Sequence, residues 1–140
     1  MTITVETSAA LGPEVVAIRR AVFVVEQGVS EACELDGTDE GCTHWLLRED
    51  GRAVATLRTR RDGDAVKIGR VATVTAARGR GHAARLMGEA MAAARADGAR
   101  RAVLSAQVAV IPWYERLGFR AAGAAYDDAG IPHRDMAAVL

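Results

Sequence analysis

The hydrophobic pattern of the chain changes its period at one point, and this change restricts the fold more than any other feature. Before Thr75, the segment Val66 to Val74 is mostly apolar and suits a strand. After it, apolar residues between Ala83 and Ala94 recur at helical spacing, and Gly98 suits the end of the helix. A strand, a turn and a long helix in this order begin a parallel crossover, so the sequence predicts an α/β fold.

The turn at this point reads Arg78-Gly79-Arg80-Gly81. Glycines let the backbone approach an anion, and the first amides of the following helix carry unpaired N–H groups in a favourable dipole. The turn therefore predicts a pyrophosphate site. A nucleotide P-loop requires Gly-Lys-Ser/Thr where this chain has Gly81-His82-Ala83, and a dinucleotide fingerprint requires a repeated βαβ unit, so neither motif is present. A plain helix-start turn with solvated arginines stays open as the alternative.

An amphipathic helix of three to four turns is predicted from Pro13 onward. Its apolar stripe runs from Val15 to Val25, and Arg19 lies off the stripe. The following segment, 27–42, has no period and is rich in Gly, Asp, Glu and Ser. We expect it to form a loop with a short helical turn, which serves as a lip of the substrate site.

Turn signals divide the rest of the chain into short elements. The predicted elements are strands at 3–6, 43–48, 52–60, 66–74, 102–106, 119–123 and 132–140, a brief helix between Pro112 and Gly118, and turns at 50–51, 62–63 and 127–130. The central strands form an antiparallel meander, whereas the crossover is parallel. The sequence thus predicts a mixed, mostly antiparallel twisted sheet flanked by helices on both faces.

Composition excludes several classes of partner. The 140 residues suit one domain spanning 1–140, and 18 basic residues balance 18 acidic ones, so neither nucleic acid nor an anionic membrane is expected to bind. The sequence has no apolar run of about 20 residues and no basic leader, which predicts a cytoplasmic protein. Cys33 and Cys42 are expected to be reduced thiols, and their spacing to His44 matches no common zinc pattern, so no metal is expected.

Two ordered motifs resemble a known superfamily. Arg78-x-x-Gly81-x-Ala83, after the strand Arg70 to Val74, is similar to the acetyl-CoA motif of the GNAT N-acetyltransferases. The stretch Ala106-Gln107 and the segment 112–119 (PWYERLGF) resemble the second half of that signature. Segments outside the motifs also resemble the small bacterial ElaA-like branch: 18–27, Glu34-x-Asp36, His44, and Gly130-Ile131-Pro132-His133 with Met136.

This resemblance implies the acyl-CoA N-acyltransferase fold and a reaction in which acetyl-CoA, as co-substrate, acetylates a primary amine by direct attack. It implies acetyl-CoA where the fourth and fifth strands diverge, with Tyr114 as general acid toward the departing thiolate. Small members of the superfamily are often homodimers, so a homodimer is expected. The residues expected at the cofactor are Val71, Ala72, Thr73, Val74, Arg78, Gly79, Arg80, Gly81, His82 and Ala83.

The base that deprotonates the amine is left open. Many relatives of this branch have a glutamate before the arginine of the splayed strand, but this chain has Gly69, which is no base. The remaining candidates at the substrate or its proton are ordered water, Glu26, Glu34 and Asp36, and His133 is a candidate for the border of the substrate pocket. The acceptor is not specified. The alternative function is a non-catalytic acyl-CoA-binding regulatory module.

Overall fold

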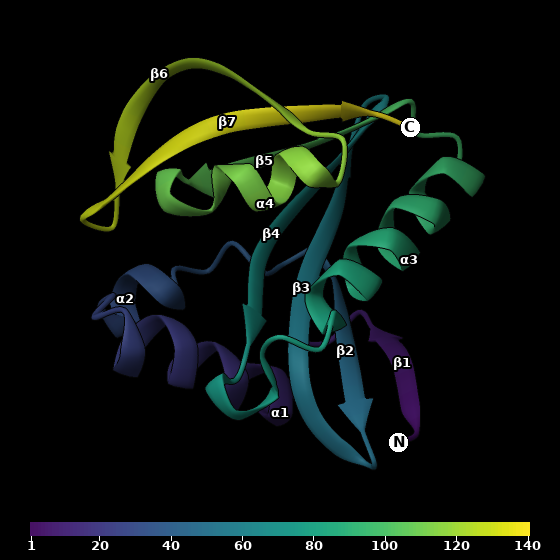
Figure 1. The fold of residues 1–140 in the computed structure, drawn as a ribbon, viewed down its shortest axis with the longest axis vertical. Coiled ribbons are helices and arrows are strands. Elements are labelled where there is room, and N and C mark those ends of the chain that lie inside the picture. The colour runs from purple at the N-terminus through teal and green to yellow at the C-terminus, as the bar shows by residue number, and fades with distance from the viewer.

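The computed structural model of the protein describes all 140 residues and contains one seven-stranded sheet (Figure 1). The strand order is β1-β2-β3-β4-β5-β7-β6, and every neighbouring pair is antiparallel except β4 and β5, which are parallel. The predicted mixed, mostly antiparallel sheet is therefore confirmed. The strands are β1 (Ile3–Ser8), β2 (Thr43–Glu49), β3 (Arg52–Asp62), β4 (Ala65–Thr73), β5 (Arg101–Gln107), β6 (Arg120–Asp128) and β7 (Ile131–Val139).

Helices cover both faces of the sheet, as two adjacent residues of β2 demonstrate. Leu46 packs in a small cluster with Val15 and Ile18 of the first helix, whereas Leu47 belongs to the main core with Leu86 of the long helix. Successive residues of a strand point to opposite faces, so these two helices lie on opposite sides. None of the helices is long and apolar enough to cross a membrane. The helical elements are α1 (Pro13–Arg19), η1 (Arg20–Glu26), α2 (Glu31–Glu34), η2 (Thr75–Ala77), α3 (His82–Ala96), η3 (Val108–Val110) and α4 (Ile111–Arg116).

The helix that begins at Pro13 departs from the expected regular pattern. Its second half, η1, is a π-helical segment of seven residues, in which hydrogen bonds reach one residue further than in an α-helix. The change in register rotates the apolar stripe, so Val25, expected on the buried face, is 81% exposed. Arg19, expected off the stripe, is buried to 1% exposure. The expectation for Val25 was wrong because it assumed an α-helical period throughout. The expectation for Arg19 was wrong for another reason, since Arg19 belongs to the regular helix α1 and follows the buried Val15 by four residues, and only its charge had placed it off the stripe.

The strand β6 is longer than expected, whereas β7 has the expected length. β6 continues beyond Gly123 to Asp128, where the sequence predicted a turn at 127–130. A register shift against β7 between Ala122 and Tyr126 accommodates this extension, and Gly123 has a φ of 81° there. Glycine tolerates this left-handed conformation, so the strand bends at Gly123 and resumes its pairing at Tyr126.

β4 and β5 separate soon after they begin. They pair only through Ala65–Lys67 of β4 and residues 101–103 of β5. β4 then continues along β3 as far as Thr73, with a bulge at Arg70, whose φ is 50°. We call the space between the two diverging strands the wedge. It confirms the expected divergence of the fourth and fifth strands.

Candidate active site

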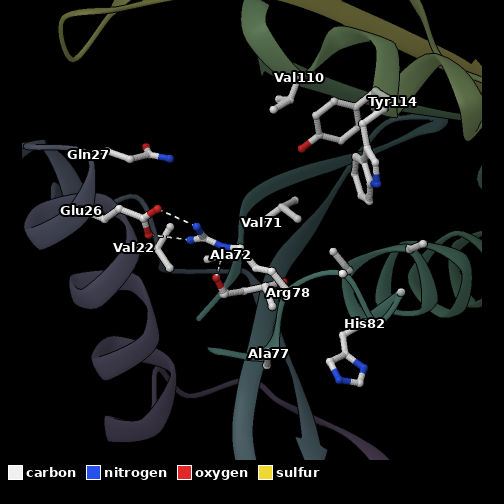
Figure 2. Close-up of a pocket in the computed structure, with 16 residues that line it drawn as sticks. Val22, Glu26, Gln27, Val71, Ala72, Ala77, Arg78, His82, Val110 and Tyr114 are labelled. Atoms are coloured by element: carbon white, nitrogen blue, oxygen red, sulfur yellow. Dashed lines mark hydrogen bonds and ion pairs between the residues drawn. The ribbon is translucent and has the colours of Figure 1, made fainter. Parts of the chain in front are cut away.

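A cavity of about 470 Å³ opens at the wedge, beside the end of β4 and the start of α3 (Figure 2). Its lining comes from three regions that are far apart in the sequence: the end of the first helical region from Val22 to Gln27, the stretch from the end of β4 to the start of α3, and the region of η3 and α4. The lining residues are Val22, Glu26, Gln27, Val71, Ala72, Thr73, Ala77, Arg78, Gly79, Gly81, His82, Ala83, Ala84, Val110, Trp113 and Tyr114.

The wedge leaves backbone amides of β4 without a strand partner. Val74 donates its N–H to Val54 of β3, and amides along a strand point alternately to its two sides. The N–H groups of Thr73 and Val71 are therefore directed to the other side, toward the wedge. β5 no longer pairs with β4 at this level. The cavity thus contains preorganised hydrogen-bond donors that belong to the main chain.

The turn before α3 provides a second set of donors. Gly79 and Gly81 have φ values of 77° and 78°, which residues with a side chain rarely adopt, and Gly81 is the N-cap of α3. No side chain caps this end. The first amides of a 15-residue helix therefore face outward with the positive end of the helix dipole, which suits an anion such as a phosphate.

Arg78 crosses the cavity to the end of η1. Its guanidinium makes two hydrogen bonds of 2.6 Å to the Glu26 carboxylate, and its Nε donates to the carbonyl of Thr73 at 3.0 Å (Figure 2). The hydrogen bonds from Arg78 lower the pKa of Glu26 despite a smaller opposing effect of burial. The Glu26 carboxylate is therefore a weaker proton acceptor than a free glutamate, which argues against a role as the base.

Tyr114 lies on α4 with its ring in the core and its hydroxyl oxygen pointing into the cavity (Figure 2). The residue is 8% exposed, and its ring meets Trp113 and Phe119 edge-on, with centroids 4.9 and 6.0 Å away. Burial raises the pKa of the Tyr114 phenol to about 12. The hydroxyl therefore keeps its proton at neutral pH and can donate it inside the cavity.

Comparison with known proteins agrees with this geometry. A family model described as an acetyltransferase (GNAT) domain matches residues 7–140. The chain belongs to the GNAT acetyltransferase family.

Relatives and solved structures are similar to this GNAT protein over most of its length. A UPF0039 protein of Mycobacterium tuberculosis is 38% identical over 133 residues, which cover 88% of this chain and 81% of the relative. A solved structure of an acyl-CoA N-acyltransferase from Pseudomonas aeruginosa has a TM-score of 0.85 at 33% identity, covering 98% and 99% of the two chains. Escherichia coli ElaA has a TM-score of 0.85 at 28% identity with the same coverage, which agrees with the ElaA-like resemblance.

Two residues expected at the cofactor of this GNAT domain do not line the cavity. The Arg80 side chain forms an ion pair with Glu49 at the end of β2, and Val74 packs against the hydrophobic core. Glu49 also accepts a 2.6 Å hydrogen bond from His82, whose ring points away from Tyr114 (Figure 2). Arg80 and His82 thus anchor the glycine-rich turn to the sheet with their side chains.

The residues predicted to contact the substrate or to accept its proton do not lie together in the structure. Of these, Glu26 lines the cavity, whereas Glu34, Asp36 and His133 do not. Glu34 is 2% exposed and pairs with Arg19, so it has no surface for a substrate. Asp36 bonds to the hydroxyl of Thr38 at 2.6 Å. His133 lies on β7, outside the cavity lining.

A buried ionic network behind the cavity was not predicted. Arg19 pairs with Glu34 and, at 2.7 Å, with Asp39, which also accepts a hydrogen bond of 2.8 Å from Arg58. Burial alone would raise the pKa of Asp39, but the two arginines outweigh it and lower the pKa to about 2. Arg70 at the bulge donates to the carbonyl of Glu34 at 3.2 Å. The network therefore fixes the 27–42 segment against the strand that borders the wedge.

A second contact that sequence reasoning missed joins the two sides of the wedge. Gln27, directly after η1, accepts a hydrogen bond of 2.9 Å from Gln107 at the end of β5. The two residues are 80 positions apart, and neither belongs to a periodic pattern. Only the family resemblance included the two residues, with Gln27 at the end of the segment 18–27 and Gln107 in the stretch Ala106-Gln107. No group of three or more His, Cys, Asp or Glu residues is arranged to hold a metal ion, and both cysteines are free thiols.

Proposed function

We propose that this GNAT protein is an N-acetyltransferase that moves the acetyl group of acetyl-CoA to a primary amine by direct attack, with Tyr114 as general acid. One observation carries this function: the unpaired amides of β4 and the buried phenol of Tyr114 open onto the same cavity. An acyl transfer needs donors for a developing oxyanion and an acid for the leaving group, and these two features supply both.

The successive parts of acetyl-CoA fit successive regions of the cavity. The pyrophosphate fits the N-terminus of α3, where Gly79 and Gly81 allow close approach of the main chain. The amide-containing pantetheine arm is expected to run along the free edge of β4, as an additional strand would. The thioester then reaches the region of Val71 and Tyr114, which both line the cavity.

Each protein group has a defined task in the transfer. A free amide of β4 stabilises the negative charge that develops on the thioester oxygen, and one such donor is worth roughly 3 kcal/mol. Tyr114 gives its proton to the departing sulfur. Its pKa of about 12 means that it holds this proton through the neutral and mildly alkaline range. Side-chain identity at Thr73 matters little, because the main chain acts. A cytoplasmic location and a homodimer stay predictions.

Calorimetric titration with acetyl-CoA, followed by thiol release against an amine panel, tests this function. The panel contains polyamines, amino acids, an aminoglycoside, and peptides with a free N-terminus or lysine. We expect binding and turnover of at least one amine. The Tyr114→Phe variant should keep its acetyl-CoA affinity and lose roughly 100-fold in kcat, a typical contribution of a general acid. Binding without turnover would support the regulatory module instead, and absence of binding would contradict both functions.

A further inference from the structure

The proposed reaction has an acid for the leaving thiolate but still lacks a group that takes the proton of the amine. An alkylammonium ion is not nucleophilic, so the incoming amine must lose a proton before it attacks. Both carboxylate oxygens of Glu26 accept hydrogen bonds from Arg78, which makes this carboxylate a weaker proton acceptor, and Glu34 is buried in its own ion pair. Another residue near the wedge is therefore a better candidate for the base.

A histidine of β7, His133, lies beside the end of β5, on the opposite face of the sheet from Tyr114. Ala106 belongs to the core that contains Tyr114, so Gln107, the next residue, points to the other face. His133 of β7 is directly opposite Gln107 in the antiparallel register, and directly opposite residues share a face. His133 is therefore adjacent to the Gln107 side chain, which contacts Gln27 at the cavity.

This face of the C-terminal strands is open. Ser105 and Asp135, which are directly opposite one another, are exposed, whereas Leu104 and Met136 on the other face are buried in the core. An amine can thus approach the wedge from this side, while α4 closes the side that carries Tyr114. Acid and base on opposite faces suit a direct attack, because the amine enters on one side and the thiol leaves on the other.

The surroundings of His133 fix both its ring and its tautomer. Nδ1 lies 2.7 Å from the carbonyl oxygen of Ile131, which can only accept, so the neutral ring has its proton on Nδ1 and its lone pair on Nε2. The ring stacks on Tyr126, with centroids 6.3 Å apart and an interplanar angle of 25°. The Tyr126 hydroxyl is fixed by Ser105 and by Asp135, to which it donates at 2.6 Å.

Two titratable side chains lie beside His133. Asp135 lies two residues along β7 on the same face, and Tyr126 of β6 stacks on the ring. Imidazole is the side chain best suited to exchange protons at neutral pH.

We infer that His133 is the base of the acetyl transfer, an assignment that rests on the proposed function. Nε2 takes one proton from the ammonium group of the acceptor, directly or through one water. The free amine forms the N–C bond to the acetyl carbon, the C–S bond breaks, and the sulfur takes the proton of Tyr114. The acetylated nitrogen loses its second proton to solvent, Tyr114 is reprotonated from solvent, and His133 releases its proton.

The test compares wild type with His133→Asn, which keeps a donor near the Ile131 carbonyl but has no basic nitrogen. His133→Gln is a second variant in case the first does not fold, and Asp128→Asn in the exposed hairpin is the matched control. With the alkylamine that wild type acetylates fastest, we expect His133→Asn to lose roughly 100-fold in kcat/KM at pH 7. Acetyl-CoA affinity should not change, and Asp128→Asn should behave as wild type.

Three further readouts separate a base from a structural residue. The variant should lose the one-proton acidic limb of the pH profile of kcat/KM, and free imidazole should restore part of its rate. It should also lose far less with a weakly basic alkoxyamine, which is already neutral at pH 7. If wild type acetylates an amine and His133→Asn has the same rate and pH profile, the inference about His133 is wrong and the proposed function stands. If wild type acetylates no amine, the proposed function and this inference both fail.

Discussion

Two arginine–glutamate pairs involve the segment from α1 to α2, and they differ in burial. Arg19 and Glu34 join α1 to α2 within the segment, whereas Glu26 of η1 pairs with Arg78 outside it. Arg19 and Glu34 each expose 1% of their side chains, whereas Arg78 and Glu26 expose 40% and 39%. Breaking a buried pair leaves a charge without water or partner, but an exposed pair exchanges its partner for solvent. The first pair therefore holds the fold, and the second can open when another anion competes for Arg78.

The largest effect is expected from Arg19→Met, which removes the shared partner of Glu34 and Asp39. Loss of one member of a buried pair costs roughly 3 to 5 kcal/mol, because the remaining carboxylates stay buried. Urea denaturation measures this free energy of unfolding. Arg20→Met is the matched control, since the adjacent pair Arg20–Glu31 is more than half exposed and should contribute less than about 1 kcal/mol. Equal effects of both variants would contradict the comparison.

A smaller loss is expected from Asp39→Asn, and it depends on pH. The pKa of Asp39 is about 2 in the folded protein, below the reference value of 3.8. A lowered carboxyl pKa stabilises the fold above the reference value, and this stabilisation disappears as pH falls from about 3.8 to 2. The shift corresponds to about 2 kcal/mol at pH 7. Unfolding curves of wild type and variant should therefore converge near pH 2. A constant difference over this range would assign the effect to packing.

Opening the exposed pair should alter binding more than stability. Glu26→Gln should leave the urea midpoint of unfolding nearly unchanged, as expected for a surface pair. It also removes a negative charge beside the proposed phosphate site and frees Arg78, so acetyl-CoA should bind roughly 3-fold more tightly. Calorimetry measures the Kd. Weaker binding of acetyl-CoA would mean that Glu26 is needed to hold Arg78 in place. The exposed pair would then have a structural role, like the buried pair of Arg19 and Glu34.

The smallest effect is expected within α3. Arg85 and Glu89 form an i,i+4 pair at 3.1 Å, with 51% and 44% of their side chains exposed. Glu89→Gln should lower stability by about 0.3 to 0.5 kcal/mol and leave acetyl-CoA affinity unchanged. It serves as the reference for Glu26→Gln, because both variants remove one exposed glutamate from an arginine. A changed Kd would indicate a long-range effect of charge on binding.

Sequence reasoning located the strands, the crossover and the glycine-rich turn, because each depends on neighbouring residues. It could not locate Arg19, since the charge of an arginine suggested the polar face and its burial depends on partners 15 and 20 positions away. The π-helical register of η1 has no known signal in the sequence, so Val25 was placed on the wrong face. The contact between Gln27 and Gln107 likewise depends on the assembled sheet.

For the candidate site, the motif resemblance was necessary. Periodicity predicts a strand at Val66 to Val74 but not that β5 leaves it after Lys67. The family motif indicated the divergence and drew attention to Tyr114. It did not indicate that Arg80 and His82 are held by Glu49, because β2 contributes that partner from 31 and 33 residues away. Motifs thus identified the main chain of the site better than its side chains.

The short pairing between β4 and β5 has a further consequence for how the molecule opens. The four strands from β1 to β4 and the three from β5 to β7 share only three residue pairs, so the two parts of the sheet are joined along a narrow seam. Parts of a protein can open separately in the native state. We expect amide hydrogens of β6 and β7 to exchange sooner than those of β3. A molecule bound along both strands would join the two parts, and their exchange rates would then become similar.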